Sequence, residues 1–114
     1  MTHDSDSDLA KRMYRIDRYM VPKASLPEFL TGVRKMAAFL RTLQGLVRTF
    51  AVEAEAGPDK VNVITIAEWD SVESIRKAVV KVREMHQQNG TDRQQNLNRL
   101  GVTAEQSEYK PVTA

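Results

Sequence analysis

The sequence predicts one α+β domain in which helices pack on an antiparallel sheet. Three observations carry this prediction: segments with apolar residues at helical spacing, short segments rich in β-branched and aromatic residues, and turn or cap signals between them. A chain of 114 residues is long enough for one core. We expect residues 1–10 to be a disordered acidic tail and residues 11–114 to form the domain.

The first strand and the first helix follow this tail. Residues 13–21 combine tyrosine, isoleucine and valine with polar residues, as a strand does, and Pro22 ends the strand because proline has no N–H to donate. Ser25 and Glu28 have the spacing of a capping box, which predicts a helix start. Apolar residues then recur at helical spacing until Gly45, a natural helix end.

A hairpin and a second helix come next. Residues 46–55 and 61–69 predict two strands joined by the turn-forming residues 57–60. Asp70 and Glu73 form a second capping box, and the helix after it has an apolar stripe at Val72, Ile75, Val79, Val82 and Met85 or His86.

The last elements are a short helix and a weakly patterned strand. Residues 91–94 predict a cap, Leu97 and Leu100 anchor the short helix, and residues 102–109 form the final strand. The order is therefore β-α-β-β-α-(short α)-β with an antiparallel sheet, which is the ferredoxin-like pattern.

The strand at residues 61–69 also predicts a homodimer. Ile64 and Ile66 alternate with Val61 and Val63, so both faces of the strand are apolar. Two helices cover one face of the sheet, and a second subunit stacking its own sheet would cover the other face.

The composition restricts the classes of function. The absence of cysteine excludes disulfides, thiolate metal sites and a cysteine nucleophile, and favours a cytoplasmic location. No apolar run is long enough to predict a membrane span, and no export signal is evident. The formal net charge of +2 and the absence of aromatic residues from 61–67 argue against nucleic-acid binding.

The chain resembles the dimeric α+β barrel proteins of the antibiotic-biosynthesis monooxygenase type. The matching elements are Tyr19-Met20-Val21-Pro22, Phe29-Leu30, Gly45-Leu46-Val47 and, above all, Ile66-Ala67-Glu68-Trp69-Asp70-Ser71. The resemblance covers about residues 13–110 and implies a dimeric barrel fold. In haem-degrading relatives, an asparagine stands at the position of Asp17, a tryptophan at that of Trp69 and a histidine near that of Val79. Of these three residues only the tryptophan is present here, and haem binding is a third option behind the two functions below.

This resemblance implies a cofactor-independent monooxygenase that takes a small aromatic or polycyclic substrate between sheet and helices. Asp17, Trp69 and His86 are its candidate catalytic residues, and substrate-binding candidates are Tyr14, Tyr19 and Arg18. Deprotonating a phenol or anthrone gives an anion that reacts with O₂, which requires a base and a shaped cavity but no metal or other cofactor.

Each candidate also has a structural interpretation. Trp69 can close the core, and His86 can be a structural or surface residue. Asp17 and Arg18 can form ion pairs, with Arg15, Arg48 or Glu68 as candidate partners. The alternative function is a non-catalytic dimeric ligand-binding or stress-related protein on the same scaffold.

Overall fold

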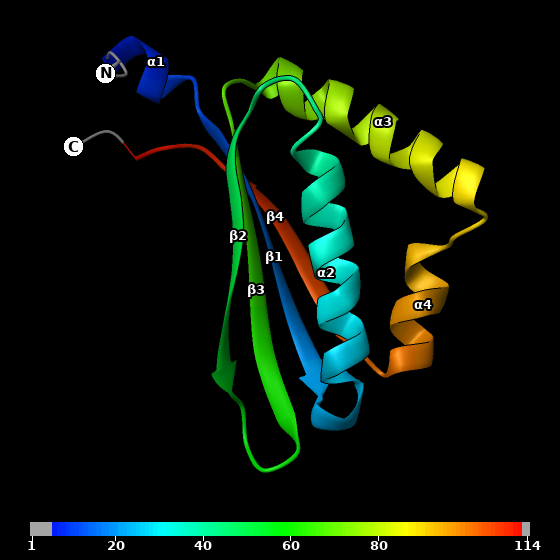
Figure 1. Ribbon diagram of the computed structural model, residues 1–114. Helices are drawn as coiled ribbons and strands as arrows, with labels where there is room; N and C mark the ends of the chain where they lie inside the picture. The colour runs from blue at the N-terminus through cyan, green and yellow to red at the C-terminus, as the bar shows by residue number, and fades with distance from the viewer. Residues whose placement is uncertain (1–5, 113–114) are drawn as a thin grey trace.

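The computed structural model describes residues 6–112 as a four-stranded antiparallel sheet with its main helices on one face (Figure 1). The strands are β1 (Met13–Pro22), β2 (Leu46–Glu55), β3 (Lys60–Trp69) and β4 (Thr103–Tyr109), in the spatial order β2-β3-β1-β4. All three neighbouring pairs are antiparallel. The predicted ferredoxin-like α+β arrangement is confirmed.

The helices are α2 (Leu26–Leu40), α3 (Val72–Asn89) and α4 (Arg93–Leu100), with a 3₁₀ turn at Lys23–Ser25. A short helix, α1, spans Asp6–Ala10, within the segment that the sequence assigns to a disordered tail. Residues 1–5 of that tail lie outside the described residues, so its disorder stays a prediction there.

The helix caps differ in detail from the prediction. Ser25 makes no cap hydrogen bond, because the preceding 3₁₀ turn already places it in a helical conformation. Its hydroxyl instead donates to the carbonyl oxygen of Leu100 at 2.7 Å, which ties α2 to the end of α4. Helix α3 is capped by Ser71 rather than Asp70, and helix α4 by Asp92 as predicted for that segment. Capping boxes therefore located the helices but not every cap contact.

Two apolar clusters fill the layer between sheet and helices. One cluster joins β1, β3, α2 and α4, and contains Tyr19, Val21, Phe29, Val61, Val63, Leu97, Leu100 and Val102. The other joins β3 and α3, and contains Ala67, Trp69, Ile75 and Ala78. Both clusters draw on odd-numbered residues of β3, so these residues define the helix-facing side of the sheet.

The buried face of α3 is rotated slightly about the helix axis relative to the predicted apolar stripe. Ile75 and Ala78 are buried, whereas Val72 and Val79 are exposed. The small Ala78, which is not part of the predicted stripe, packs in the cluster with Trp69 and Ile75.

The opposite face of the sheet is open and apolar. Phe50, Val52 and Tyr109 are 41%, 48% and 41% exposed on it, and Ile64 and Ile66 are only half-buried. By the strand alternation and the register, the even-numbered residues of β1 and β3, and those of β2 from Arg48 onward, point to this face. The predicted two-sided apolar character of β3 is therefore present, with helices covering one side only.

Gly45 fixes the junction at which β3 leads into α3. Its φ of +93° favours glycine, and a Cβ there would collide with the Ser74 side chain. Its carbonyl oxygen accepts from the Asp70 N–H at 2.9 Å. The close approach of the chain segments at Gly45 and Asp70 holds the end of β3 beside Leu46.

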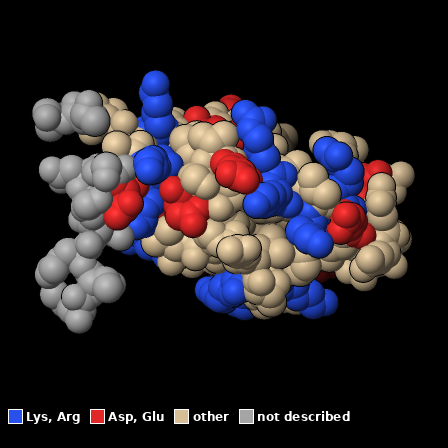
Figure 2. All heavy atoms as spheres, turned by 90° about the horizontal axis from the view of Figure 1, so that it is seen from above, with Lys and Arg blue, Asp and Glu red and all other residues tan. Residues whose placement is uncertain are grey.

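Charge is mixed over the surface. Figure 2 shows lysine and arginine side chains interspersed with carboxylates on the face seen from above. Within residues 6–112 there is no helix with the length and apolar character that a membrane crossing requires.

Candidate functional site

Asp17 lies on the helix-facing side of β1, opposite Thr65 of β3, and its side chain is 15% exposed. Its Oδ1 accepts from the Arg15 Nε at 2.8 Å, and its Oδ2 accepts from the Tyr19 hydroxyl at 3.1 Å. Of the candidate ion-pair partners Arg15, Arg48 and Glu68, Arg15 is the one that pairs with Asp17, whereas Arg48 and Glu68 pair with each other. Alternation along one strand brings the three side chains together, because residues 15, 17 and 19 share a face.

Tyr19 connects Asp17 to helix α4. Its hydroxyl oxygen accepts from the Arg93 Nη2 at 3.1 Å, and the guanidinium carbon lies 5.7 Å from the centre of its ring. Burial, followed by the negative charge of Asp17, raises the pKa of Tyr19 above its ordinary value, while Arg93 acts in the opposite direction. The neutral phenol is therefore the favoured form, suited to donating to Asp17.

Arg15 extends these contacts to the edge strand. Its Nη2 donates to the Gln106 Oε1 at 2.5 Å, so the polar chain runs from α4 through β1 to β4. We call Arg15, Asp17, Tyr19, Arg93 and Gln106 the Asp17 network. Sequence analysis missed Arg93 and Gln106, because an arginine after a helix cap and a glutamine in an edge strand resemble surface residues.

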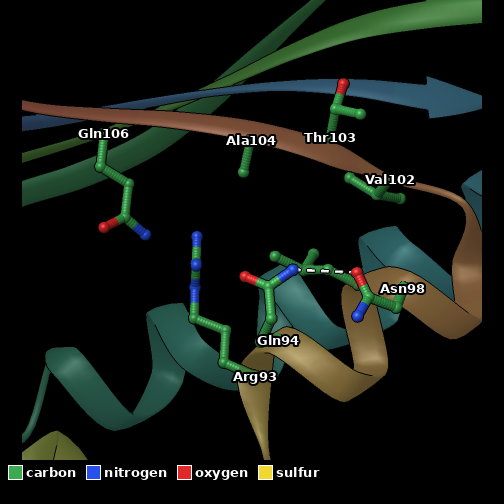
Figure 3. Close-up of a pocket in the computed structure, with 8 residues that line it drawn as sticks. Arg93, Gln94, Asn98, Val102, Thr103, Ala104 and Gln106 are labelled. Carbon is green, nitrogen blue, oxygen red and sulfur yellow. Dashed lines mark hydrogen bonds between the residues drawn. The ribbon is translucent and has the colours of Figure 1, made fainter.

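A pocket of about 470 Å³ opens between α4 and β4, beside this network (Figure 3). Its volume is in the range of small-molecule sites. Its lining residues are Arg93, Gln94, Leu97, Asn98, Val102, Thr103, Ala104 and Gln106. Figure 3 shows the Arg93 side chain rising from α4 toward β4, between Gln106 and Gln94. Arg93 and Gln106 therefore belong both to the Asp17 network and to the wall of the pocket.

Trp69 is 3% exposed and packs in the α3-side apolar cluster. In the register it lies four residues beyond Thr65, the partner of Asp17, and the pocket between α4 and β4 is lined by neither Trp69 nor Asp17. The structure thus places Trp69 on the same sheet face as Asp17 but in a separate cluster.

His86 lies on α3 at helical spacing from the buried Ile75. Its Nδ1 is 2.7 Å from the Thr91 hydroxyl. Its Nε2 is buried, and no described residue forms a hydrogen bond with it. This nitrogen is therefore a buried polar atom with unused hydrogen-bonding capacity, near the C-terminal end of α3.

Tyr14 and Arg18 lie on the open face, opposite to Asp17. The Tyr14 hydroxyl contacts the Glu68 Oε2 at 3.4 Å, and Arg18 is exposed. The structure therefore separates these two predicted substrate-binding residues from Asp17 and Tyr19, and one pocket within a single chain does not bring all four together.

Glu68 is the centre of a second polar group, the Glu68 network, formed with Arg12, Arg48 and Tyr14. Glu68 and Arg12 are only 5% and 7% exposed. The Arg12 Nη1 donates to the Glu68 Oε2 at 3.0 Å, and the Arg48 Nε donates to the Glu68 Oε1 at 2.7 Å.

Among the residues that the structure describes, no three histidine or carboxylate side chains gather as metal ligands would.

Comparison with known proteins bears on this fold. Models of known protein families and curated protein sequences give no match. Among solved structures, SnoaB, a cofactor-independent oxygenase from Streptomyces nogalater, matches with a TM-score of 0.68 at 22% identity, over 92% of this chain and 97% of that chain. A proposed antibiotic biosynthesis monooxygenase from Deinococcus radiodurans matches with a TM-score of 0.66 at 13% identity, over 90% of this chain and 94% of that chain.

A third structure, a dimeric ferredoxin-like protein from an uncultured marine organism, matches with a TM-score of 0.71 at 11% identity, over 91% of this chain and 98% of that chain. The chain has the ferredoxin-like fold that these structures share. The resemblance read from the sequence is thereby confirmed for the fold, while function depends on the residues of the site.

In this ferredoxin-like fold, the element Glu68-Trp69-Asp70-Ser71 has several structural roles. Glu68 holds the arginines of the open face, and Trp69 fills the core below α3. Ser71 caps α3, and the Asp70 Oδ1 accepts from the Ser74 hydroxyl at 2.5 Å. The most recognisable part of the sequence therefore builds the junction between β3 and α3.

Proposed function

We propose that this chain is a cofactor-independent monooxygenase that acts on a small aromatic or polycyclic substrate between the sheet and the helices. The observation that carries the proposal is the hydrogen-bonded series Arg93–Tyr19–Asp17 on the helix-facing side of β1. A carboxylate that can receive a proton through a buried phenol is the acid–base group that this chemistry requires. The shared fold with SnoaB, a cofactor-independent oxygenase, adds support.

The proposed reaction begins with proton removal from an acidic phenol or from a CH₂ carbon flanked by aromatic rings. Tyr19 accepts this proton as its own hydroxyl proton moves to Asp17. The substrate anion then reduces O₂ and takes up a proton, giving a hydroperoxide. The carbon that bears the hydroperoxide keeps one hydrogen, both in the CH₂ case and at an unsubstituted ring position of the phenol. The intermediate therefore loses water, so that one oxygen atom remains as a carbonyl and the other leaves as water.

Two further residues have proposed roles in this scheme. The buried Nε2 of His86 is a second candidate proton acceptor, because no described residue uses it. Trp69, which packs in the apolar cluster below α3, is proposed to keep water from the anion. A cytoplasmic location, where O₂ and small aromatic metabolites are both accessible, completes the proposal.

Oxygen consumption with a panel of anthrones and hydroquinones tests the proposal. We expect uptake above the enzyme-free rate for at least one compound, and a decrease of about 100-fold or more in Asp17→Asn, because general-base catalysis contributes roughly that much. Glu73→Gln, an exposed carboxylate on α3, is the matched control and should retain full uptake. Failure of every compound, or full activity in Asp17→Asn, would contradict the proposal.

A second candidate function is a non-catalytic ligand-binding or stress-related protein. The observation in its favour is that both oxygens of Asp17 are already occupied, by Arg15 and by Tyr19, as in a structural ion pair. Saturable binding of an aromatic compound without any oxygen uptake would favour this candidate.

We also propose that the chain forms a homodimer through the open face of the sheet. Phe50 and Val52 are exposed there beside the half-buried Ile64 and Ile66, and burying this area would stabilise a dimer. The marine protein of the same fold is described as dimeric. Sedimentation equilibrium should give twice the chain mass for the wild type and a shift toward monomer for Phe50→Glu. A monomeric wild type at micromolar concentration would contradict this proposal.

A further inference from the structure

The pocket between α4 and β4 has a single charged side chain in its wall, and that side chain is positive. Arg93 is accompanied by the amides Gln94, Asn98 and Gln106, and no carboxylate lines the pocket. The remaining wall is formed by small or apolar side chains, among which Leu97 and Val102 are buried. The lining therefore has the charge and polarity to receive an anion with an apolar body.

Arg93 differs from the other shielded arginines of the described residues. Only three arginines there are not exposed: Arg12, Arg15 and Arg93. Arg12 pairs with Glu68 and Arg15 with Asp17, whereas no described carboxylate pairs with Arg93. The Arg93 guanidinium contacts the hydroxyl and the ring of Tyr19, which are both uncharged groups. A partly buried guanidinium is stabilised by an anionic partner. The described part of the chain supplies no anionic partner for Arg93.

Gln106 presents a donor to the same pocket. Its Oε1 is occupied by the Arg15 Nη2, which leaves its Nε2 free to donate. Figure 3 shows this amide nitrogen on the side that faces Arg93. The Arg15 contact therefore orients Gln106 with its amide N–H toward the pocket. The pocket wall then holds two hydrogen-bond donors, Arg93 and Gln106.

We propose that this pocket binds the oxyanion of an aromatic ligand, a carboxylate or phenolate, with Arg93 and Gln106 as its donors. The ring system lies against Leu97, Val102 and Ala104. This inference deepens the proposed function, because it assigns a negative charge to the ligand that the Asp17 network would act upon. It rests on the proposed function for the aromatic part of that ligand. Arg93 is then a specificity-determining residue, since it contacts both the ligand and Tyr19.

The test compares benzoate and 2-naphthoate with their neutral amides, benzamide and 2-naphthamide, by calorimetric titration at low ionic strength. We expect at least one carboxylate to bind about tenfold or more tightly than its amide, as a charge-assisted hydrogen bond allows. In Arg93→Gln the carboxylate and the amide should bind within about twofold of each other. Unchanged binding of the amide serves as an internal check that the pocket of the variant is folded.

Arg83→Gln is the matched control, because Arg83 is an exposed arginine on α3 outside the pocket lining, and it should keep the wild-type preference. Gln106→Leu, which leaves Arg93 in place, should reduce the preference by about threefold. If Arg93→Gln does not fold, this second variant decides. Absence of carboxylate binding, equal binding of carboxylate and amide, or a preference that both pocket variants retain would overturn the inference.

The outcome is separable from that of the proposed function. A carboxylate preference that depends on Arg93, without oxygen uptake, would support the anion site and count against the monooxygenase. Oxygen uptake that depends on Asp17, without any Arg93-dependent preference, would support the monooxygenase and overturn the anion site.

Discussion

Glu68 and Asp17 are two arginine-paired carboxylates on the neighbouring strands β3 and β1, and they point to opposite faces of the sheet. Glu68 is almost fully buried, and its oxygens accept from Arg12, Arg48 and Tyr14. This arrangement leaves Glu68 little capacity for another partner. The Glu68 network therefore has the properties of a structural ion cluster.

The Asp17 network combines the same residue types differently. Its two ends, Arg93 and Gln106, both lie in the wall of a pocket. Arg93 carries a charge that no described carboxylate compensates. The difference shows that an arginine–carboxylate pair alone does not indicate a function; the informative features are where the network ends and whether its charges are balanced.

Replacing Glu68 should give the largest effect. Glu68→Gln removes the buried carboxylate charge that pairs with Arg12 and with Arg48, so we expect the free energy of unfolding to fall by about 3 kcal/mol. Urea unfolding at a fixed protein concentration measures this, because a dimer would make the stability concentration-dependent. A loss below about 1 kcal/mol would show that the Glu68 network is not a structural cluster, and would remove the contrast with Asp17.

Replacing Tyr19 should give an intermediate effect that depends on pH. Tyr19→Phe removes the hydroxyl between Asp17 and Arg93, which should cost about 1 kcal/mol at pH 8. The pKa of Tyr19 is raised above 10.0 by burial and by the charge of Asp17, so the folded state favours the neutral phenol. This stabilisation is fully present below pH 10 and is lost as the pH rises through the folded-state pKa.

The difference in unfolding free energy between wild type and Tyr19→Phe should therefore shrink when the pH is raised from 8 to 11. Urea unfolding at each pH measures it, and subtraction of the two proteins removes the contribution of groups that both contain. A difference that stays constant over this range would mean that Tyr19 ionises equally easily in the folded and unfolded states.

The fold could be predicted well because hydrophobic periodicity and turn residues report on local structure. The predicted strand at residues 46–55 matches β2 to the residue, and Leu97 and Leu100 are the buried anchors of α4 as expected. Ser25 shows the limit of local reasoning, because its hydroxyl bonds to Leu100, which is 75 residues away in the chain. Local patterns carry no information on such contacts.

The candidate site could be predicted only in part. Asp17, Tyr19 and Arg15 share a strand face, so their proximity follows from alternation. Arg93 lies 74 residues from Tyr19, and their contact depends on how α4 returns over the sheet. The same alternation places Tyr14 and Arg18 on the opposite face of the sheet from Asp17, so their separation could be predicted from the sequence.

Replacing Glu73 should give the smallest effect and provides the baseline for both networks. Glu73 and Lys77 form an i,i+4 ion pair at 3.3 Å on α3, with side chains that are 76% and 72% exposed. Water screens such a pair, so Glu73→Gln should change the free energy of unfolding by about 0.3 kcal/mol, less so in 0.5 M salt. Urea unfolding with and without salt measures this. The Glu73–Lys77 pair and the Glu68 network differ most in solvent exposure. If Glu73→Gln lowered the free energy of unfolding as much as Glu68→Gln, burial would not be the reason for the stabilising effect of the Glu68 network.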